Sequence, residues 1–101
     1  MADRETARPD PRLIEALEHL SHGGWQRAHP LVQDDKSPEA AWLHGIVHTL
    51  EGDLENARHW YRKANRDFPG PDAVEAEIAA ARASLVHATG SAHGRRSQPN
   101  S

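Results

Sequence analysis

Residues 42–69 place small, aromatic and helix-breaking residues at fixed intervals, and this spacing restricts the possible folds more than any other part of the chain. The pattern consists of Gly45, His48, Gly52, Ala57, Tyr61, Ala64 and Pro69. Gly52 lies between two apolar stripes of helical period, where a glycine ends one helix and the following Asp53 caps the next. The pattern therefore predicts two antiparallel helices joined by a tight turn.

Capping residues predict where other helices begin. Asp10 and Ser37 are each followed by a proline, which is the usual order of an N-cap and a first helical position. Asp72 and Glu75 have the spacing of a capping-box analogue before a last, alanine-rich helix. Together with the pair at residues 42–69, these signals predict five helices.

Glycine and proline predict where the helices end. Glycines at positions 23–24 follow the first apolar stripe, and the sequence Pro-Gly-Pro at 69–71 follows the fourth. Pro30 lies inside the second stripe, where it removes a backbone donor and clashes with the preceding turn. The second helix should therefore be short or kinked.

Apolar periodicity is confined to residues 10–88, which we expect to form one small helical domain. Residues 1–9 are charged and residues 89–101 are polar, and neither segment has apolar periodicity. Residues 1–9 are therefore predicted to be a disordered leader, and residues 89–101 a disordered tail. The predicted core consists of Leu17, Leu20, Leu43, Ile46, Val47, Leu50, Leu54, Ala57, Tyr61, Ala64 and Ile78.

A weak internal repeat supports paired helices. A shift of 29 residues aligns His19 with His48, Gly23 with Gly52 and Ala28 with Ala57. These matches fall at positions where a helical hairpin restricts the residue type: at a helix–helix contact, at the turn and at the closest crossing point.

The series from Gly45 to Pro69 resembles the tetratricopeptide repeat at its small, aromatic, turn and proline positions. Residues 28–64 also look like a group of small uncharacterised bacterial helical proteins. The resemblance implies an all-α, five-helix array of two antiparallel hairpins with a C-terminal capping helix. It indicates a non-enzymatic module that binds a protein or peptide partner, and it supplies no activity.

Composition excludes several classes of protein. The 101 residues contain no cysteine, so thiolate metal ligation and disulfides are absent. Acidic and basic residues are spread along the chain with a net charge of -3, which predicts no nucleic-acid partner. The first ten residues lack a secretory layout and no apolar run suits a membrane span, so a cytoplasmic location without membrane contact is expected. No cofactor is predicted.

A groove on the inner face of the helices is the first candidate binding site. Trp42 is its expected anchor, because an aromatic side chain offers a large contact area at low entropic cost. The predicted lining consists of Leu13, Leu17, Glu39, Trp42, Ile46 and Thr49. The alternative is that Trp42 packs inside so small a domain.

Trp60 is the second candidate binding residue, because it lies one position away from the apolar stripe of its helix. With Arg58 and His59 it could form an exposed patch for a partner or for a second copy of the chain, giving a homodimer. Packing of Trp60 beneath the fifth helix is the alternative.

Histidines supply the competing hypothesis, a metal-binding protein or a small metal-dependent hydrolase. His44 and His48 have the spacing that puts two imidazoles on one helical face. The third ligand would come from His19 on the neighbouring helix, or from Glu15 or Glu51. The HExxH motif is absent, and the repeat pattern explains His48 as a packing residue. The other five histidines, His29 among them, are interpreted as surface or terminal residues. Nucleophile elbows and phosphate loops are also absent, so no enzyme is predicted.

Overall fold

The computed structural model describes residues 10–94, with side chains described for residues 10–86, and the regular secondary structure of this part of the chain is entirely helical. The elements are α2 (Pro11–Ser21), α3 (Trp25–Val32), α4 (Pro38–Glu51), α5 (Leu54–Lys63), the 3-10 turn η1 (Pro71–Ala73) and α6 (Val74–Gly94). Within the described range there are five α-helices and no strand, which confirms the all-α class. The predicted leader lies outside the described residues.

Side-chain caps begin three of the helices at the predicted residues. Asp10 accepts a hydrogen bond of 2.9 Å from the backbone N–H of Arg12 at the start of α2. Ser37 accepts from the N–H of Ala40 at 3.1 Å, and Asp53 accepts from its own first turn in the same way. Each cap satisfies an N–H group that the helix itself leaves unpaired.

The two turns related by the 29-residue shift have the same geometry. Gly23 and Gly52 both adopt the left-handed conformation, with φ of 75° and 95°. In the first turn the N–H of Gly24 donates to the carbonyl of His19, and in the second the N–H of Asp53 donates to the carbonyl of His48. The sequence repeat therefore corresponds to a repeated turn structure.

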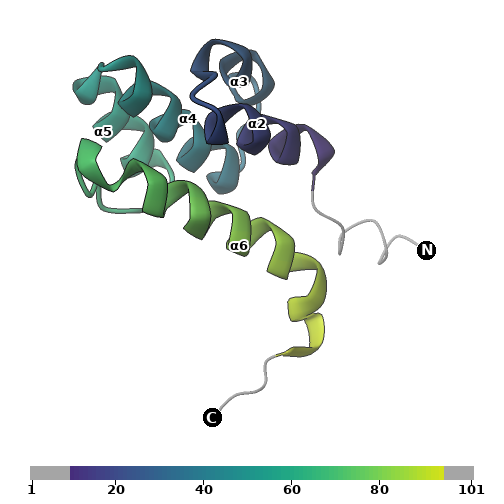
Figure 1. Cartoon of the computed structure of the whole chain (residues 1–101). Coiled ribbons are helices and arrows are strands. Elements are labelled where there is room, and N and C mark those ends of the chain that lie inside the picture. The colour runs from purple at the N-terminus through teal and green to yellow at the C-terminus, as the bar shows by residue number, and fades with distance from the viewer. Residues whose placement is uncertain (1–9, 95–101) are drawn as a thin grey trace.

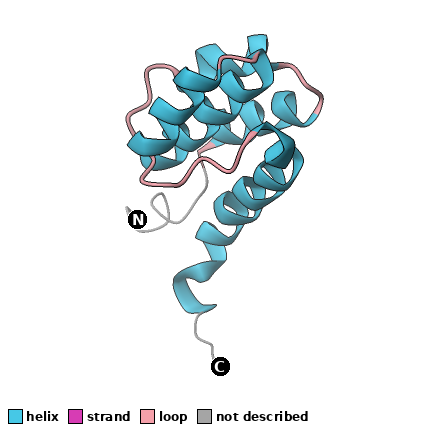
Figure 2. Cartoon of the chain, turned by 90° about the vertical axis from the view of Figure 1, so that its left-hand side faces the viewer, coloured by secondary structure: helices cyan, strands magenta, loops and turns pink. Residues whose placement is uncertain are grey.

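Helix α4 is the central element, because it packs against α2, α3, α5 and α6. Consecutive helices also lie side by side, α2 with α3 and α4 with α5. Helix α6 then crosses α2 and α4, and its C-terminal part projects beyond the other helices (Figures 1 and 2).

A close approach of α5 to α4 depends on Gly45. A Cβ atom added there would lie 2.5 Å from Cδ1 of Tyr61, which is closer than side-chain carbons approach one another. Tyr61 is almost fully buried, so its ring has little space into which to move. The glycine is therefore required for this crossing.

The predicted core is confirmed except at two leucines. Leu50 and Leu54 are half-buried because they flank the turn at Gly52, at the edge of the domain. The other predicted core residues are buried: Leu17, Leu20, Leu43, Ile46, Val47, Ala57, Tyr61, Ala64 and Ile78.

The last helix differs from its prediction at both ends. Asp72 lies within η1, and the residue before that turn is Gly70, so no side-chain capping box is formed. Helix α6 continues to Gly94, beyond the domain boundary expected at residue 88. The extension is physically reasonable because no proline occurs after Pro71 until Pro99. The remainder of the predicted tail, residues 95–101, lies outside the described residues.

Candidate functional site

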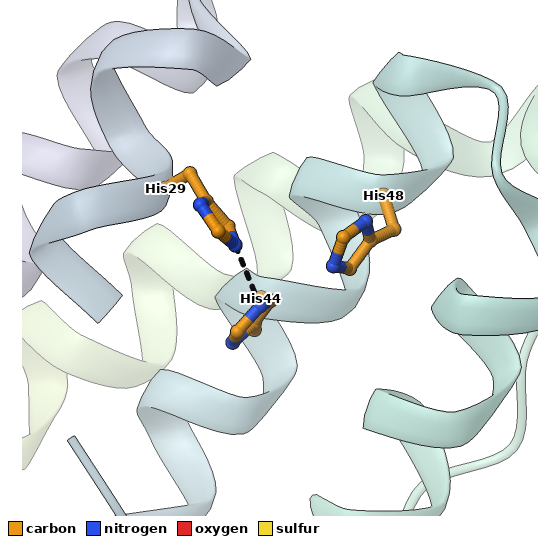
Figure 3. Close-up of side chains that lie close together, drawn as sticks. All are labelled: His29, His44 and His48. Carbon is orange, nitrogen blue, oxygen red and sulfur yellow. Dashed lines mark hydrogen bonds between the residues drawn. The ribbon is translucent and has the colours of Figure 1, made fainter. Parts of the chain in front are cut away.

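Three histidines from two helices meet at one side of α4. His29 comes from α3, and His44 and His48 come from α4 (Figure 3). The Nε2 atoms of His29 and His44 are 3.1 Å apart. The ring centroids of His44 and His48 are 5.0 Å apart, and those of His29 and His48 are 5.5 Å apart. We call His29, His44 and His48 the histidine cluster.

Helical spacing and helix packing assemble this cluster. His44 and His48 are four residues apart, so their rings lie over one another on the same face of α4, with 21° between the ring planes. His29 follows the buried Ala28, which seats α3 against the rest of the domain. The contact between α3 and α4 therefore brings the third imidazole to the first two.

An aromatic ring from α5 covers one side of the cluster. Trp60 stacks on His44 with 3.8 Å between ring centroids and 8° between planes. The ammonium group of Lys63 lies over the Trp60 ring at 5.5 Å, and His59 meets its edge. Trp60 is half-buried as a result. Its exposure therefore lies between that of a fully exposed patch and that of a residue buried beneath the fifth helix, the two alternatives that the sequence left open.

Burial controls the protonation of the central histidine. Burial, followed by the charges of His29, His48 and His59, lowers the pKa of His44 from 6.5 to about 3. Its Nδ1 atom is buried without a hydrogen-bond partner. His44 is therefore a neutral imidazole at pH 7.

His48 is held by a carboxylate. Its Nδ1 atom lies 2.7 Å from Oε1 of Glu51, one turn further along α4. This contact occupies one ring nitrogen and leaves Nε2 as the atom free to meet the other two rings. His48, Glu51 and Asp53 also form a second group that could hold a metal ion, but both of its carboxylates are at the surface.

His19, the third ligand expected from the sequence, does not join the cluster. Its Nε2 atom lies 3.6 Å from a carboxylate oxygen of Glu15, on the same helix. The repeat makes His19 equivalent to His48, and equivalent positions on successive helix pairs need not be neighbours. His29 takes that place, so its interpretation as a surface residue was wrong. The contact of α3 with α4 is the signal that would have identified it.

Within the described residues, α6 covers the face that was expected to line an open groove. Leu13, Leu17, Trp42 and Ile46 are at most 3% exposed, and Thr49 is 7% exposed. Among the predicted lining residues only Glu39 is exposed. The apolar face exists as predicted, but it is filled by the chain's own last helix, chiefly by Ile78, Ala81 and Leu85.

Trp42 belongs to a polar contact beneath α6. Its indole N–H donates to Oε1 of Glu77 at 3.0 Å, and the hydroxyl of Tyr61 donates to the same oxygen at 2.7 Å. Burial and the contact with Glu77 raise the pKa of Tyr61, which keeps the hydroxyl protonated. The guanidinium of Arg66 lies 3.3 Å from the centre of the Trp42 ring. These contacts explain why Trp42 is buried, as in the alternative reading of the sequence.

A small cleft remains open beside Trp60. It has a volume of about 230 Å³ and is lined by Gln33, Asp35, Lys36, Ala41, Trp60 and Lys63. A larger and more open depression, of about 610 Å³, is lined only by polar and charged residues of the exposed face of α5 and its cap. The cleft at Trp60 therefore combines an aromatic surface with charged groups.

Comparison with known proteins gives no relative: no family model, curated protein or solved structure matches the chain. Within the described residues, no helix combines the length and the apolar character that crossing a membrane requires.

Proposed function

We propose that this chain is a non-enzymatic protein-interaction module whose helices form two tetratricopeptide-like antiparallel hairpins, closed by α6. The equivalent left-handed turns at Gly23 and Gly52 support this arrangement. The small residues Ala28 and Ala57 support it as well, since both are completely buried at equivalent positions. Helical hairpins of this kind commonly present surfaces for other proteins.

The observation that carries the proposal is the half-buried Trp60 in the wall of the cleft. Aromatic side chains at the edge of a concavity anchor partners because they bury a large area without losing many rotamers. With the inner face covered by α6, Trp60 is a predicted partner-binding residue that keeps an aromatic surface in the wall of an open cleft.

Charges at the cleft indicate the chemistry of the partner. Asp35 already accepts a hydrogen bond of 2.9 Å from the N–H of Ser37, so its carboxylate is engaged within the loop. Lys36 and Lys63 are exposed, and both line the cleft. The best-matched occupant is a peptide segment that places an apolar side chain on Trp60 and a carboxylate near the two ammonium groups.

Selection from a random peptide library displayed on phage tests this proposal. Wild-type protein should enrich peptides in which an apolar residue is adjacent to aspartate or glutamate. A Lys36→Glu/Lys63→Glu variant should lose these peptides, because it reverses both charges at the cleft. The matched control is Arg12→Glu/Arg27→Glu, which makes the same change of net charge at exposed positions that do not line the cleft.

Enrichment that is equal on both variants would contradict the proposed surface, as would a failure to enrich any motif. Sedimentation of the wild type at several concentrations tests the homodimer. Association that the Lys36→Glu/Lys63→Glu change abolishes would identify a second copy of the chain, instead of a peptide, as the occupant.

A further inference from the structure

We propose that His29, His44 and His48 form a binding site for a divalent transition-metal ion such as Zn²⁺. The inference is independent of the proposed peptide surface, because it rests on the histidine cluster and on Glu51, none of which lines the cleft at Trp60. No carboxylate of the second group, His48 with Glu51 and Asp53, is required as a direct ligand.

The distances between the ligand atoms suit a metal ion. Zn²⁺ binds imidazole nitrogen at about 2.0–2.1 Å in tetrahedral geometry, so two such nitrogens lie about 3.3–3.4 Å apart. The Nε2 atoms of His29 and His44 are already 3.1 Å apart. Ligand atoms of all three histidines lie within 4.8 Å of one another. A small rotation of the third ring therefore completes the site.

The orientation of His48 also suits a metal ligand. A metal-bound imidazole usually donates its other ring nitrogen to a carboxylate or carbonyl, which fixes the tautomer and the direction of the ring. Glu51 lies 2.7 Å from Nδ1 of His48, which is the position of such a partner. In Figure 3 the His48 ring is turned toward the other two histidines. The free nitrogen is consequently Nε2.

The facing nitrogens of the cluster are costly without an ion. A hydrogen bond between the Nε2 atoms of His29 and His44 uses one proton for two nitrogens. A purely apolar contact at this place would be served by leucine or phenylalanine without burying polar ring nitrogens. Coordination gives the lone pairs on the facing nitrogens a common acceptor.

The nature of the ligands limits the ion. Three neutral imidazoles suit zinc, copper, nickel, cobalt or iron, whereas calcium and magnesium prefer oxygen ligands. The chain has no cysteine that could add a thiolate. His48 is 12% exposed and His29 is half-buried, so an ion can enter from solvent and keep a water molecule in the fourth position.

Titration of tag-free, chelator-treated full-length protein with Zn²⁺, followed by calorimetry, tests the site. We expect one ion per chain. Glu51→Gln should weaken binding by about 10-fold, at the low end of the effect of removing a partner that orients a ligand, and His29→Gln and His48→Gln, which remove ligands, should each weaken it by about 100-fold or more. His19→Gln and His59→Gln are the matched controls and should bind as the wild type does.

Side-chain nitrogen NMR supplies a readout that general histidine affinity would not reproduce. Zinc should shift the Nε2 resonances of the three cluster histidines and leave those of His19 and His59 unchanged. Circular dichroism checks the fold of each variant; should buried His44→Gln fail to fold, the more exposed His29 and His48 variants still carry the test. Binding that is absent in the wild type, or equally weakened by His19→Gln, would overturn the proposal.

Discussion

The hydroxyl of Tyr61 on α5 donates a hydrogen bond of 2.7 Å to Oε1 of Glu77 on α6. The same oxygen accepts from Trp42 on α4, so one carboxylate connects three helices. Glu77 is half-buried, which makes these bonds less screened than surface contacts.

Tyr61→Phe should therefore destabilise the protein by about 1–2 kcal/mol, since it removes one charge-assisted hydrogen bond and leaves the ring packed. Urea denaturation followed by circular dichroism measures the change. The slope of the free energy of unfolding against urea concentration should be the same as in the wild type. Glu77→Gln retains an acceptor oxygen and is expected to cost less. A Tyr61→Phe variant as stable as the wild type would refute this contact between α5 and α6.

Gly45→Ala should destabilise the protein even though alanine is the better helix former. The added Cβ would lie 2.5 Å from Cδ1 of Tyr61, and overpacking of this kind costs about 1–3 kcal/mol, against a propensity gain of about 1 kcal/mol. A double-mutant cycle with Tyr61→Leu provides the control, because removal of the ring should reduce the penalty. Equal penalties in both backgrounds would show that the ring is not the obstacle.

Trp42→Ala should cause a large loss of stability, about 3–5 kcal/mol, because the side chain is 3% exposed and supports α6. Thermal unfolding is the measurement. Trp25→Ala is a useful comparison, since Trp25 is only half-buried and should cost less. A folded Trp42→Ala protein with an unchanged melting temperature would instead indicate that Trp42 lines a surface groove and does not belong to the core.

Acid should weaken the fold through His44. Its pKa of about 3 in the folded protein lies below the ordinary 6.5, so between these values the unfolded chain binds a proton that folded His44 does not. Well above pH 6.5, His44 is neutral in both states and does not affect the free energy of unfolding. As the pH is lowered through 6.5, the unfolded chain gains a proton and the free energy of unfolding decreases. From pH 7.5 to 5.0 this single group should remove about 2 kcal/mol from the free energy of unfolding.

His44→Gln is the control for this pH effect, since glutamine does not titrate and should flatten the decline. The charged groups around His44 are His29 and His48 in the cluster, His59 beyond Trp60, Glu51 on His48 and Lys63 over Trp60. The pKa of His44, followed by NMR in the folded protein, must stay well below 6.5; a titration near 6.5 would exclude this explanation.

Local signals predicted the helices well. Asp10, Ser37 and Asp53 cap helices as expected, and Gly52 makes the turn, because these effects depend on residues within one helical turn. Asp72 is the exception, since the preceding chain enters a 3-10 turn through Gly70. Short-range chemistry therefore explains most element boundaries.

Long-range packing could not be obtained from the same signals. The apolar stripe that contains Trp42 has the same period whether it faces a partner or α6, so periodicity does not distinguish a groove from a core. Likewise, no spacing relates His29 to His44, because they approach only when α3 packs on α4. The sites on this protein depend on which helix covers which face.

The closing position of α6 has a consequence for how the protein is made. Synthesis proceeds from the N-terminus, so α2 to α5 leave the ribosome before the residues that cover Leu13 and Trp42 leave it. Until Ile78, Ala81 and Leu85 emerge, the nascent chain carries an uncovered apolar face. Completion of the core must therefore wait for nearly the whole domain, and this interval is the period in which a chaperone could bind it.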